Sequence, residues 1–402
     1  MRPHPRGGVA LRILYLNHNV AFSGGTFHRA FHFAGELAGR GHEVTLLSIS
    51  PDRRAGFTER HEGGVRVVET PDVFWGRGRT GWDPTDALRR MWWLVGKKFD
   101  LVHGWDCRPV VIGPSLFARR LSRKIGCALF LDWCDWWGRG GTQSERPGGP
   151  ARILYEPVET FFEEAFRRNA DGTTVISEPL RERAASLGVP RERIWLLPQG
   201  CETVDWPADA RDSARRQLGI ASGAEVVLSV GVLLPRDGEL LFEAMRIVAG
   251  ENARAQLIVV GKHGTTIPRD LLERGIVKET GFVPAEILTQ YMQACDVVAV
   301  PLADTLAGQA RWPSRANRFL AAERAVVMTR VSDLAALLER ERAGIITEPS
   351  PAAFAAGLLA ALRLPDERAS IVSRAKALAA GPLAWSKLAA TLEGCYATVM
   401  NR

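Results

Sequence analysis

A strand that leads through a pair of glycines into a helix is the first segment able to do chemistry. The strand reaches Leu16, the turn contains Gly24 and Gly25, and a helix is predicted to begin near Phe27. Adjacent glycines let another molecule approach the backbone closely, and free amides at a helix amino terminus favour an anion such as a diphosphate. The two glycines are therefore candidate phosphate-binding residues. A Gly-Gly turn can also simply relieve steric conflict between strand and helix, and both interpretations stay open.

Several common cofactor and metal patterns are missing. The first loop lacks G-x-G-x-x-G, and G-x-x-x-x-G-K-[ST] occurs nowhere in the 402 residues. These absences argue against an NAD enzyme or a P-loop kinase. The six cysteines are scattered, with no Cys-x-x-Cys pair and no Cys/His spacing suited to zinc. We therefore expect a reducing compartment and no structural metal.

Polar and aromatic residues follow two further predicted strands. His103 and Asp106 come at the end of one strand, and the tryptophan-rich segment Leu131 to Gly141 follows the next. Aromatic faces there could stack on a sugar or a lipid-like acceptor, and the polar groups could contact sugar hydroxyls. The alternatives are a buried histidine with its hydrogen bonds satisfied and tryptophans that pack in the core.

Short apolar runs alternate with segments of helical period along the whole chain, which predicts an α/β protein with parallel sheets. We expect strands at Leu11–Leu16, Val44–Ile49, Val65–Glu69, Leu101–His103, Ala128–Asp132, Thr174–Ile176 and Ile194–Leu197, and then at Val226–Val230, Gln256–Val260, Val297–Val300, Val326–Thr329 and Gly344–Ile346. The aperiodic segment from Pro198 to Ala210 separates the two series. This predicts two doubly wound domains facing across a cleft, at residues 1–200 and 201–382, with a final helix at 383–402 packing back on the first.

The basic surplus lies entirely in the first half. Residues 1–200 contain 29 Lys and Arg against 22 Asp and Glu, whereas residues 201–402 contain 23 of each, which accounts for the net charge of +7. A modest surplus of this kind is typical of a solvated surface, or it attracts acidic lipid headgroups; we expect no nucleic-acid partner. The amino terminus has no apolar signal segment, and no run of about 18 apolar residues occurs. We expect a cytoplasmic protein that either stays in solution or is peripheral at the inner face of the membrane.

One segment has the composition of a membrane-surface helix. Leu88 to Lys98 mixes two tryptophans and leucines with arginines and lysines, as a helix lying in a bilayer interface would. Tryptophan and leucine at helical spacing also occur in ordinary core helices. Membrane contact and core packing therefore both remain open for this segment.

Seven segments in order resemble the family 4 glycosyltransferases. They cover nearly the whole chain and read ILYLNHNVAFSGGTFHRAFHFAGELAGRGHEVTLLS, FDLVHGWDCRP, ADGTTVISEPLRERAASLGV, LLPQGCE, VVLSVGVLLPRDG, LIVVGKHG and RWPSRANRFLAAERAVV. The resemblance implies a GT-B fold of two Rossmann-like domains, the second holding a nucleotide-sugar donor and the first an acceptor. It also implies retention of anomeric configuration and no bound metal or cofactor. Basic side chains and helix-end amides would stabilise the leaving diphosphate.

Functional residues carry over position by position from this resemblance. Arg315 stands where a branch of the family begins its donor-site helix with tryptophan-proline-x-lysine, and its fork of donors suits diphosphate oxygens. The residues expected to act in catalysis are His103, Arg236 and Arg315. Those expected to bind the donor are Gly24, Gly25, Gly231, Gly261, Arg311, Ser314 and Arg318. Those expected to contact the acceptor are Trp105, Asp106, Asp132 and Trp136.

The turn after Gly231 departs from the family. Where the family has an arginine and a lysine, this chain has Val232 and Asp237, with Arg236 beside the latter. A carboxylate there is expected to repel phosphate. Arg236 would have to supply the missing charged hydrogen bonds, each contributing about 1.5 to 3 kcal/mol.

Other family positions are also changed. Ala310 and Arg318 replace the two carboxylates of the family's Glu-x7-Glu, and Glu323 replaces a glycine before the next strand. Trp105 replaces the active-site histidine, and its indole offers one donor and no acceptor.

Three functions are compatible with these features. The first is a glycosyltransferase acting on an unidentified glycan, lipid-linked sugar or small molecule. The second is an inactive GT-B homologue that serves as partner or activator subunit of a transferase. The third is another nucleotide-sugar enzyme on the same fold, such as an epimerase.

Overall fold

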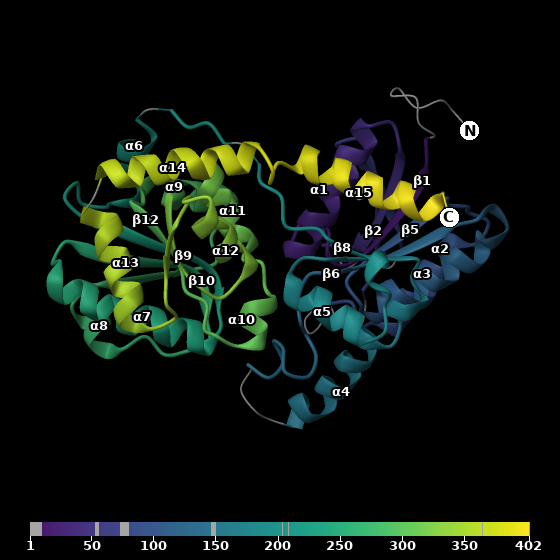
Figure 1. Ribbon diagram of the computed structural model, residues 1–402, viewed down its shortest axis with the longest axis horizontal. Coiled ribbons are helices and arrows are strands. Elements are labelled where there is room, and N and C mark those ends of the chain that lie inside the picture. Colours follow the sequence, from purple (N-terminus) through teal and green to yellow (C-terminus); the bar gives the residue numbers. More distant parts are fainter. Residues whose placement is uncertain are drawn as a thin grey trace. The chain divides into compact units, whose positions relative to one another are not determined.

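The chain folds into two compact units. The computed structural model describes residues 10–52, 56–72, 80–145, 150–202, 204–207, 209–363 and 365–401 (Figure 1). Unit 1 comprises Met1–Gln143, Gly149–Gln199 and Trp385–Arg402, and unit 2 comprises Ser144–Gly148 and Gly200–Ala384. Residues 1–9, on which the expectation about a signal segment largely rests, lie outside the described residues.

Unit 1 is built on an eight-stranded sheet in the order β3-β4-β2-β1-β5-β6-β7-β8. Its strands are β1 (Arg12–Val20), β2 (Glu43–Ile49), β3 (Thr58–Glu62), β4 (Val65–Thr70), β5 (Leu101–Trp105), β6 (Ala128–Trp133), β7 (Gly172–Val175) and β8 (Ile194–Leu196). All neighbours pair in parallel except β3 with β4, which is antiparallel. The strand order reverses direction between β1 and β5, the topological switch point at which doubly wound sheets bind ligands.

The two faces of this sheet are covered by different helices. The helical elements are α1 (Gly25–Gly39), α2 (Pro84–Leu94), α3 (Pro109–Leu121), α4 (Pro150–Glu164), α5 (Glu178–Ser186) and α15 (Trp385–Met400), with short turns η1 (Arg123–Ile125), η2 (Arg167–Asn169) and η3 (Arg191–Arg193). Ile13 and Tyr15 of β1 pack with α1 and α15. Leu14 and Leu16 pack with α2 and α3 on the opposite face. This alternation is what a strand buried on both sides requires.

The last helix is tied to the middle of the unit 1 sheet. The hydroxyl of Tyr396 on α15 lies 2.9 Å from the hydroxyl of Tyr15 and 2.7 Å from Nδ1 of His103. The chain enters unit 2 after Gln199 and returns at Trp385. Close to these junctions, the Cys201 amide donates to the Leu383 carbonyl at 2.7 Å.

Unit 2 contains a six-stranded parallel sheet in the order β11-β10-β9-β12-β13-β14. The strands are β9 (Glu225–Leu233), β10 (Ala255–His263), β11 (Val277–Gly281), β12 (Val297–Val300), β13 (Ala325–Thr329) and β14 (Ile345–Thr347). This is the strand order of the dinucleotide-binding doubly wound fold, with its switch point between β9 and β12. The predicted doubly wound α/β architecture is therefore confirmed in both units.

Helices cover both faces of the unit 2 sheet. They are α6 (Ala210–Leu218), α7 (Pro235–Glu251), α8 (Arg269–Glu273), α9 (Ala285–Ala294), α10 (Leu306–Ala310), α11 (Ser314–Ala321), α12 (Asp333–Arg340), α13 (Pro351–Arg363) and α14 (Pro365–Ala380). Side chains of α7 and α13 pack on one face with those of β9, β10 and β12. In the described parts of the chain, no helix combines the length and hydrophobicity needed to cross a lipid bilayer.

Each predicted strand exists, with ends that shift by a few residues. The largest extensions are at β1, which continues to Val20, and at β9 and β10, which continue to Leu233 and His263. The strands β3 and β11 were not predicted. β3 is a polar antiparallel edge strand, and four of its five residues are exposed.

Candidate functional site

Two glycines in neighbouring strands leave the backbone uncovered by side chains near the switch point of unit 2. Gly231 in β9 has φ +121° and pairs in register with Gly261 of β10, which has φ +129°. A Cβ on Gly261 would lie 2.1 Å from the carbonyl oxygen of Gly231. Only glycine allows the two backbones to pack this closely. We call Gly231 and Gly261 the glycine pair.

Arg315 occupies the space that the glycine pair leaves. A Cβ on Gly231 would lie 1.6 Å from Nη1 of Arg315, so the guanidinium lies directly against the bare backbone. Among the described residues it has no hydrogen-bond or ion-pair partner. Arg315 is exposed as a residue, although its guanidinium lies close against β9. Burial lowers the pKa of Arg315, and neighbouring Arg318 lowers it further, as expected for a cation without a nearby anion.

Asp237, in the first turn of α7, binds two other segments of unit 2 through its carboxylate. Its Oδ1 accepts from the Ala303 amide at 2.8 Å, and its Oδ2 accepts from Arg311 Nη2 at 2.6 Å. The carboxylate is 2% exposed. Arg311 therefore partly offsets the charge of Asp237, and the expectation that this carboxylate repels phosphate stays a prediction. The same pairing commits one guanidinium nitrogen of Arg311, a residue predicted to bind the donor.

The other predicted donor residues lie at two helix amino termini. Arg236 is exposed in the first turn of α7, and Ser314 begins α11, with Arg315 next to it. Arg318 is exposed one turn further along α11. Helix amino termini favour anions, and the surrounding guanidinium groups add to that field. The structure thus gathers Gly231, Gly261, Arg236, Arg311, Ser314, Arg315 and Arg318 in unit 2 around the ends of β9 and β10 and the starts of α7 and α11.

The unusual positions near α11 have simple structural consequences. Ala310 is buried at the end of α10, and Arg318 is exposed. Glu323 has φ +56°, the left-handed conformation that suits glycine, and this explains the family's preference for glycine there. The Glu323 carboxylate lies 2.6 Å from Nζ of Lys376.

Phe282 and Lys262 are surface neighbours at the same edge of the unit 2 sheet, and the sequence did not single them out. Phe282 directly follows β11 and is 62% exposed. Nζ of Lys262, in β10 next to Gly261, lies 5.6 Å from its ring centroid. An exposed aromatic ring at the carboxyl end of a strand offers a flat stacking surface for a planar ligand group.

In unit 1, Gly24 and Gly25 form the amino-terminal edge of α1. Gly24 has φ +88°, and a Cβ there would lie 2.2 Å from Nδ2 of Asn19. Both glycines are exposed. The turn therefore needs glycine at position 24 for its geometry, and it also presents free helix-end amides.

Three other residues predicted for the unit 1 site lie in the core instead. His103, Trp105 and Asp132 are each 0% exposed. His103 Nδ1 bonds the Tyr396 hydroxyl at 2.7 Å, Nε2 lies 3.3 Å from Thr174 Oγ1, and the ring stacks on Trp105. Burial lowers the pKa of His103 to about 3. The structure therefore contradicts the predicted catalytic role of His103, because both ring nitrogens are engaged inside the protein.

Asp132 belongs to a buried ion pair that the sequence did not reveal. Its two oxygens each lie 3.2 Å from Arg29 on α1, and Thr174 donates to it at 2.5 Å. Arg29 also donates to the Leu197 and Pro198 carbonyls at 2.6 and 2.9 Å. Asp132 therefore braces α1 against the sheet, and neither it nor the indole of Trp105 is accessible to an acceptor.

His18 and Asp106 meet across the unit 1 switch point. His18 Nδ1 lies 3.3 Å from Asp106 Oδ2, and both residues are at most 3% exposed. Burial lowers the pKa of His18 to about 3. Burial raises the pKa of Asp106, but His18, Arg108 and the Cys107 amide together bring it below its usual value, which keeps it ionised. Asp106 has φ +82°, a strained conformation of the kind found at functional sites.

Trp136 is only half-buried, and one face of its ring is covered. The guanidinium of Arg183 lies 3.9 Å from its ring centroid, and the indole Nε1 donates to the Arg139 carbonyl at 2.9 Å. Arg183 therefore occupies one face of the ring that was expected to contact an acceptor.

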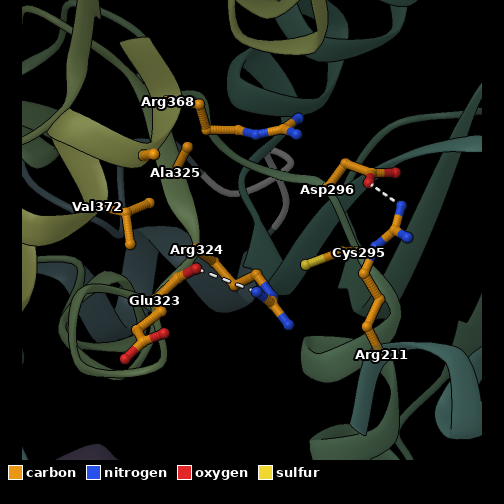
Figure 2. Close-up of a pocket in the computed structure, with 9 residues that line it drawn as sticks. Arg211, Cys295, Asp296, Glu323, Arg324, Ala325, Arg368 and Val372 are labelled. Carbon is orange, nitrogen blue, oxygen red and sulfur yellow. Dashed lines mark hydrogen bonds and ion pairs between the residues drawn. The ribbon is translucent and has the colours of Figure 1, made fainter. Parts of the chain in front are cut away.

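A cavity of about 250 Å³ lies at the opposite end of the unit 2 strands from the glycine pair. It is lined by Arg211, Cys295, Asp296, Glu323, Arg324, Ala325, Arg368, Ala369 and Val372, and Cys295 and Asp296 immediately precede β12. Figure 2 shows Arg211 paired with Asp296, and Arg324 bonded to the carbonyl of Glu323. Arg324 also donates to the carbonyls of Met292 and Gln293 at 2.9 Å each. These guanidinium groups are held by the fold itself, and the cavity is not part of the site around Arg315.

Comparison with known proteins agrees with this architecture. Residues 24–200 match the family model described as Glycosyl transferase 4-like domain, and residues 224–363 match the one described as Glycosyl transferases group 1. Sucrose-phosphate synthase from Thermosynechococcus elongatus has a similar structure, with a TM-score of 0.68 at 16% identity over 97% of this chain and 99% of that one. The chain belongs to the GT-B glycosyltransferases of the family 4 type.

Two other solved structures share this fold. Anabaena HepE, solved in complex with UDP-glucose, has a TM-score of 0.69 at 16% identity over 96% of this chain and 100% of that one. WaaG, a glycosyltransferase involved in lipopolysaccharide biosynthesis, has a TM-score of 0.68 at 17% identity over 95% of this chain and 100% of that one. The resemblance predicted from the seven sequence segments is thus confirmed.

Curated relatives at higher identity are named D-inositol 3-phosphate glycosyltransferase. The protein from Geodermatophilus obscurus is 28% identical over 328 residues, which is 77% of this chain and 66% of the relative. The one from Thermobispora bispora is 25% identical over 276 residues, which is 65% of this chain and 62% of the relative. The match therefore spans about two thirds or less of the length of these relatives.

Proposed function

We propose that this glycosyltransferase moves a sugar from a nucleoside diphosphate to an acceptor hydroxyl, with unit 2 holding the diphosphate. The observation that supports this most directly is Arg315, an unpaired guanidinium among the described residues, lying against Gly231 at the switch point of a doubly wound sheet. A doubly wound sheet binds ligands beyond the carboxyl ends of its strands at such a point. The missing side chain at Gly231 leaves room for the guanidinium to lie against the backbone, and we propose that phosphate oxygens bind to this guanidinium and to the helix-end amides beside it.

The proposed chemistry breaks one bond and forms another at the anomeric carbon. The bond from that carbon to the diphosphate oxygen breaks, the acceptor oxygen bonds to the carbon, and the proton of the acceptor hydroxyl passes to the leaving diphosphate. Negative charge grows on the leaving diphosphate, so donors placed there stabilise the transition state more than the ground state. Arg315, Arg236 and the free amides of α7 are suited to this role, and we propose that they act without a bound metal. Retention of configuration is part of the same proposal.

Uridine diphosphate is the first donor nucleotide to test. HepE, which shares the fold, has been solved with UDP-glucose. In this chain the exposed ring of Phe282 lies on the same sheet edge as the glycine pair. We propose that it stacks on the nucleobase, because an exposed aromatic ring at the carboxyl end of a strand offers a flat surface to a planar group.

The acceptor is proposed more broadly. The curated relatives carry a name that specifies an inositol phosphate acceptor, so a phosphorylated polyol is the first acceptor to try. In unit 1, the exposed helix-end amides of Gly24 and Gly25 are available near the switch point, whereas Asp106, also expected to contact the acceptor, is buried against His18.

Calorimetry with purified protein tests the donor site. UDP, GDP, ADP and TDP are titrated into the native chain and into Arg315→Ala. The native chain should bind one of them, and the variant should lose at least tenfold in affinity, the scale of one charged hydrogen bond. Arg274→Ala, an exposed arginine at the end of α8, is the matched control and should bind normally. Unchanged affinity in Arg315→Ala would remove this residue from the site.

An inactive partner subunit is the second candidate. It is favoured by one observation: Ala310 and Arg318 occupy positions where the family carries carboxylates, and Ala310 is buried with no ionisable group to offer. The active transferase and the inactive subunit are distinguished by incubating the protein with sugar derivatives of the nucleotide that it binds and with a panel of polyol acceptors. Nucleotide binding with no transfer and no donor hydrolysis would favour the subunit role.

A further inference from the structure

The exposed face of α2 carries an apolar stripe that the core does not use. Leu88, Trp92 and Val95 are 63%, 73% and 58% exposed, and their spacing of four and three residues places them on one side of the helix. The opposite side of α2 is buried through Ala87, Arg90, Trp93 and Leu94. The helix is therefore anchored by one face and leaves three large apolar side chains in contact with solvent.

A second exposed segment is joined to the end of α2 and adds one apolar side chain and positive charge. Nζ of Lys98, just after α2, donates to the Leu121 carbonyl, and the Phe99 amide donates to Ser122 Oγ at 3.1 Å. These bonds hold the end of α2 against the end of α3 and η1. Ile125 in η1 is 47% exposed, and its neighbours Arg123 and Lys124 are exposed as well.

Acidic side chains are absent from the sequence of both segments. Residues 87–99 contain four basic residues and no Asp or Glu, and residues 107–131 contain five basic residues and no Asp or Glu. The flanking acids are engaged, since Asp100 pairs with Arg12 at 2.8 Å and Asp171 pairs with Arg119 at 2.7 Å. We call Leu88, Trp92, Val95 and Ile125, together with Lys98, Arg120, Arg123 and Lys124, the basic-apolar face.

We propose that the basic-apolar face docks on an anionic lipid surface. Tryptophan and aliphatic side chains insert at the level of the lipid headgroups, and lysine and arginine around them pair with acidic headgroups. A tryptophan alone or a basic patch alone would bind a lipid surface weakly, whereas the two together bind it more strongly. Each exposed cation near such a surface strengthens binding roughly fivefold, so four of them make the charge of the lipid decisive.

Other occupants fit these features less well. A nucleic acid would use the cations but has no need of a stripe of Leu88, Trp92 and Val95. A protein partner would need complementary acids and an apolar surface of its own, and nothing about this face specifies one. The proposal is independent of sugar transfer, because it concerns unit 1 and needs neither donor nor acceptor.

Sedimentation with lipid vesicles tests the proposal on the full chain without nucleotide. Vesicles of phosphatidylcholine alone are compared with vesicles of equal parts phosphatidylcholine and phosphatidylglycerol, at low and at high salt. The native chain should sediment with the anionic vesicles, and raising the salt should release most of it. Equal binding to both vesicle types, or to neither, would overturn the proposal.

Paired variants separate the apolar contribution from the charge. Leu88→Ser with Trp92→Ser, and Arg123→Glu with Lys124→Glu, should each weaken binding at least tenfold. Ile153→Ser is the matched control, because Ile153 on α4 is 78% exposed and is not part of the basic-apolar face. It should bind like the native chain. Circular dichroism confirms folding of each variant.

The same variants decide between lipid and nucleic acid. One result would favour a nucleic acid: the charge-reversal variant loses binding to a single-stranded RNA oligonucleotide, while the serine variant binds both vesicles and RNA like the native chain. The apolar stripe would then have no function, and the lipid proposal would be wrong.

Discussion

The guanidinium of Arg315 lies so close to Gly231 that a single methyl group on that glycine would fall 1.6 Å from Nη1. The two residues are 84 positions apart in sequence, yet each defines the space available to the other. A ligand anion drawn to Arg315 must therefore also approach the open backbone of β9. The position of the Arg315 side chain can therefore be tested by replacing Gly231.

Gly231→Ala should weaken nucleotide binding by at least tenfold. The added methyl displaces the Arg315 guanidinium, and φ +121° adds strain of about 1 to 3 kcal/mol in a residue with a side chain. Titration calorimetry measures the affinity, and thermal melting measures the stability. Gly250→Ala in α7, where a Cβ would meet nothing within 4 Å, is the control and should bind normally with slightly raised stability. Normal affinity in Gly231→Ala would mean that Arg315 does not bind phosphate from its present position.

Asp237→Asn should tighten nucleotide binding about fivefold. The substitution removes a negative charge that Arg311 only partly offsets beside the amino terminus of α7, worth on the order of 1 kcal/mol, and releases Arg311 toward the ligand. An asparagine oxygen can still accept from the Ala303 amide. Glu239→Gln, an exposed carboxylate two residues further on, is the control and should change affinity little. Weaker binding in Asp237→Asn would show that the pair with Arg311 is needed to position the loop.

Glu323→Gly should be more stable than Glu323→Ala by about 1 kcal/mol. Both substitutions remove the ion pair with Lys376, but only glycine adopts φ +56° without a steric penalty. Urea unfolding of the two variants measures the difference directly, and the exposed ion pair cancels in the comparison. Equal stabilities would indicate that the turn relaxes when the side chain changes.

The stability of unit 1 should fall as the pH drops from 7 to 5, in part because of His103. Burial lowers its folded pKa to about 3, whereas the unfolded histidine titrates near 6.5. Its stabilising contribution is complete above pH 6.5 and is lost as the pH falls toward 3, because the unfolded state takes up a proton that the folded state does not. This one group accounts for about 2 kcal/mol between pH 7 and pH 5.

His103→Gln should therefore show a pH dependence smaller by about that amount when chemical unfolding is measured at both pH values. His61→Gln on the exposed strand β3 is the control and should keep the native pH dependence. A pH dependence unchanged by His103→Gln would place the responsible groups elsewhere, with His18 as the next to replace.

The sequence predicted the parallel strands because their apolar runs are local and buried on both faces. It also singled out Gly231, Gly261 and Arg315, which the structure brings together, because each lies at the end of a predicted strand or near the start of a predicted helix. The polar edge strand β3 has no such pattern, and it was missed.

The unit 1 predictions depended on contacts that no local pattern contains. His103 is satisfied by Tyr396, which is 293 residues away, and Asp132 by Arg29, which is 103 residues away. The same reason explains Asp237, whose charge is offset by Arg311 at a separation of 74 residues. Residue type and spacing identified polar groups at strand ends, but only the fold shows which of them are already engaged.

The hydrogen bond between Cys201 and Leu383 joins the outgoing and returning parts of the chain just inside unit 2. Because α15 packs into the core of unit 1, a gene fragment that ends before Trp385 would leave Tyr15 and His103 without their hydroxyl partner. A protease nick near Gly200 would have a different result: the two pieces would separate on a denaturing gel yet elute together from a native column, held by the packing of a single helix.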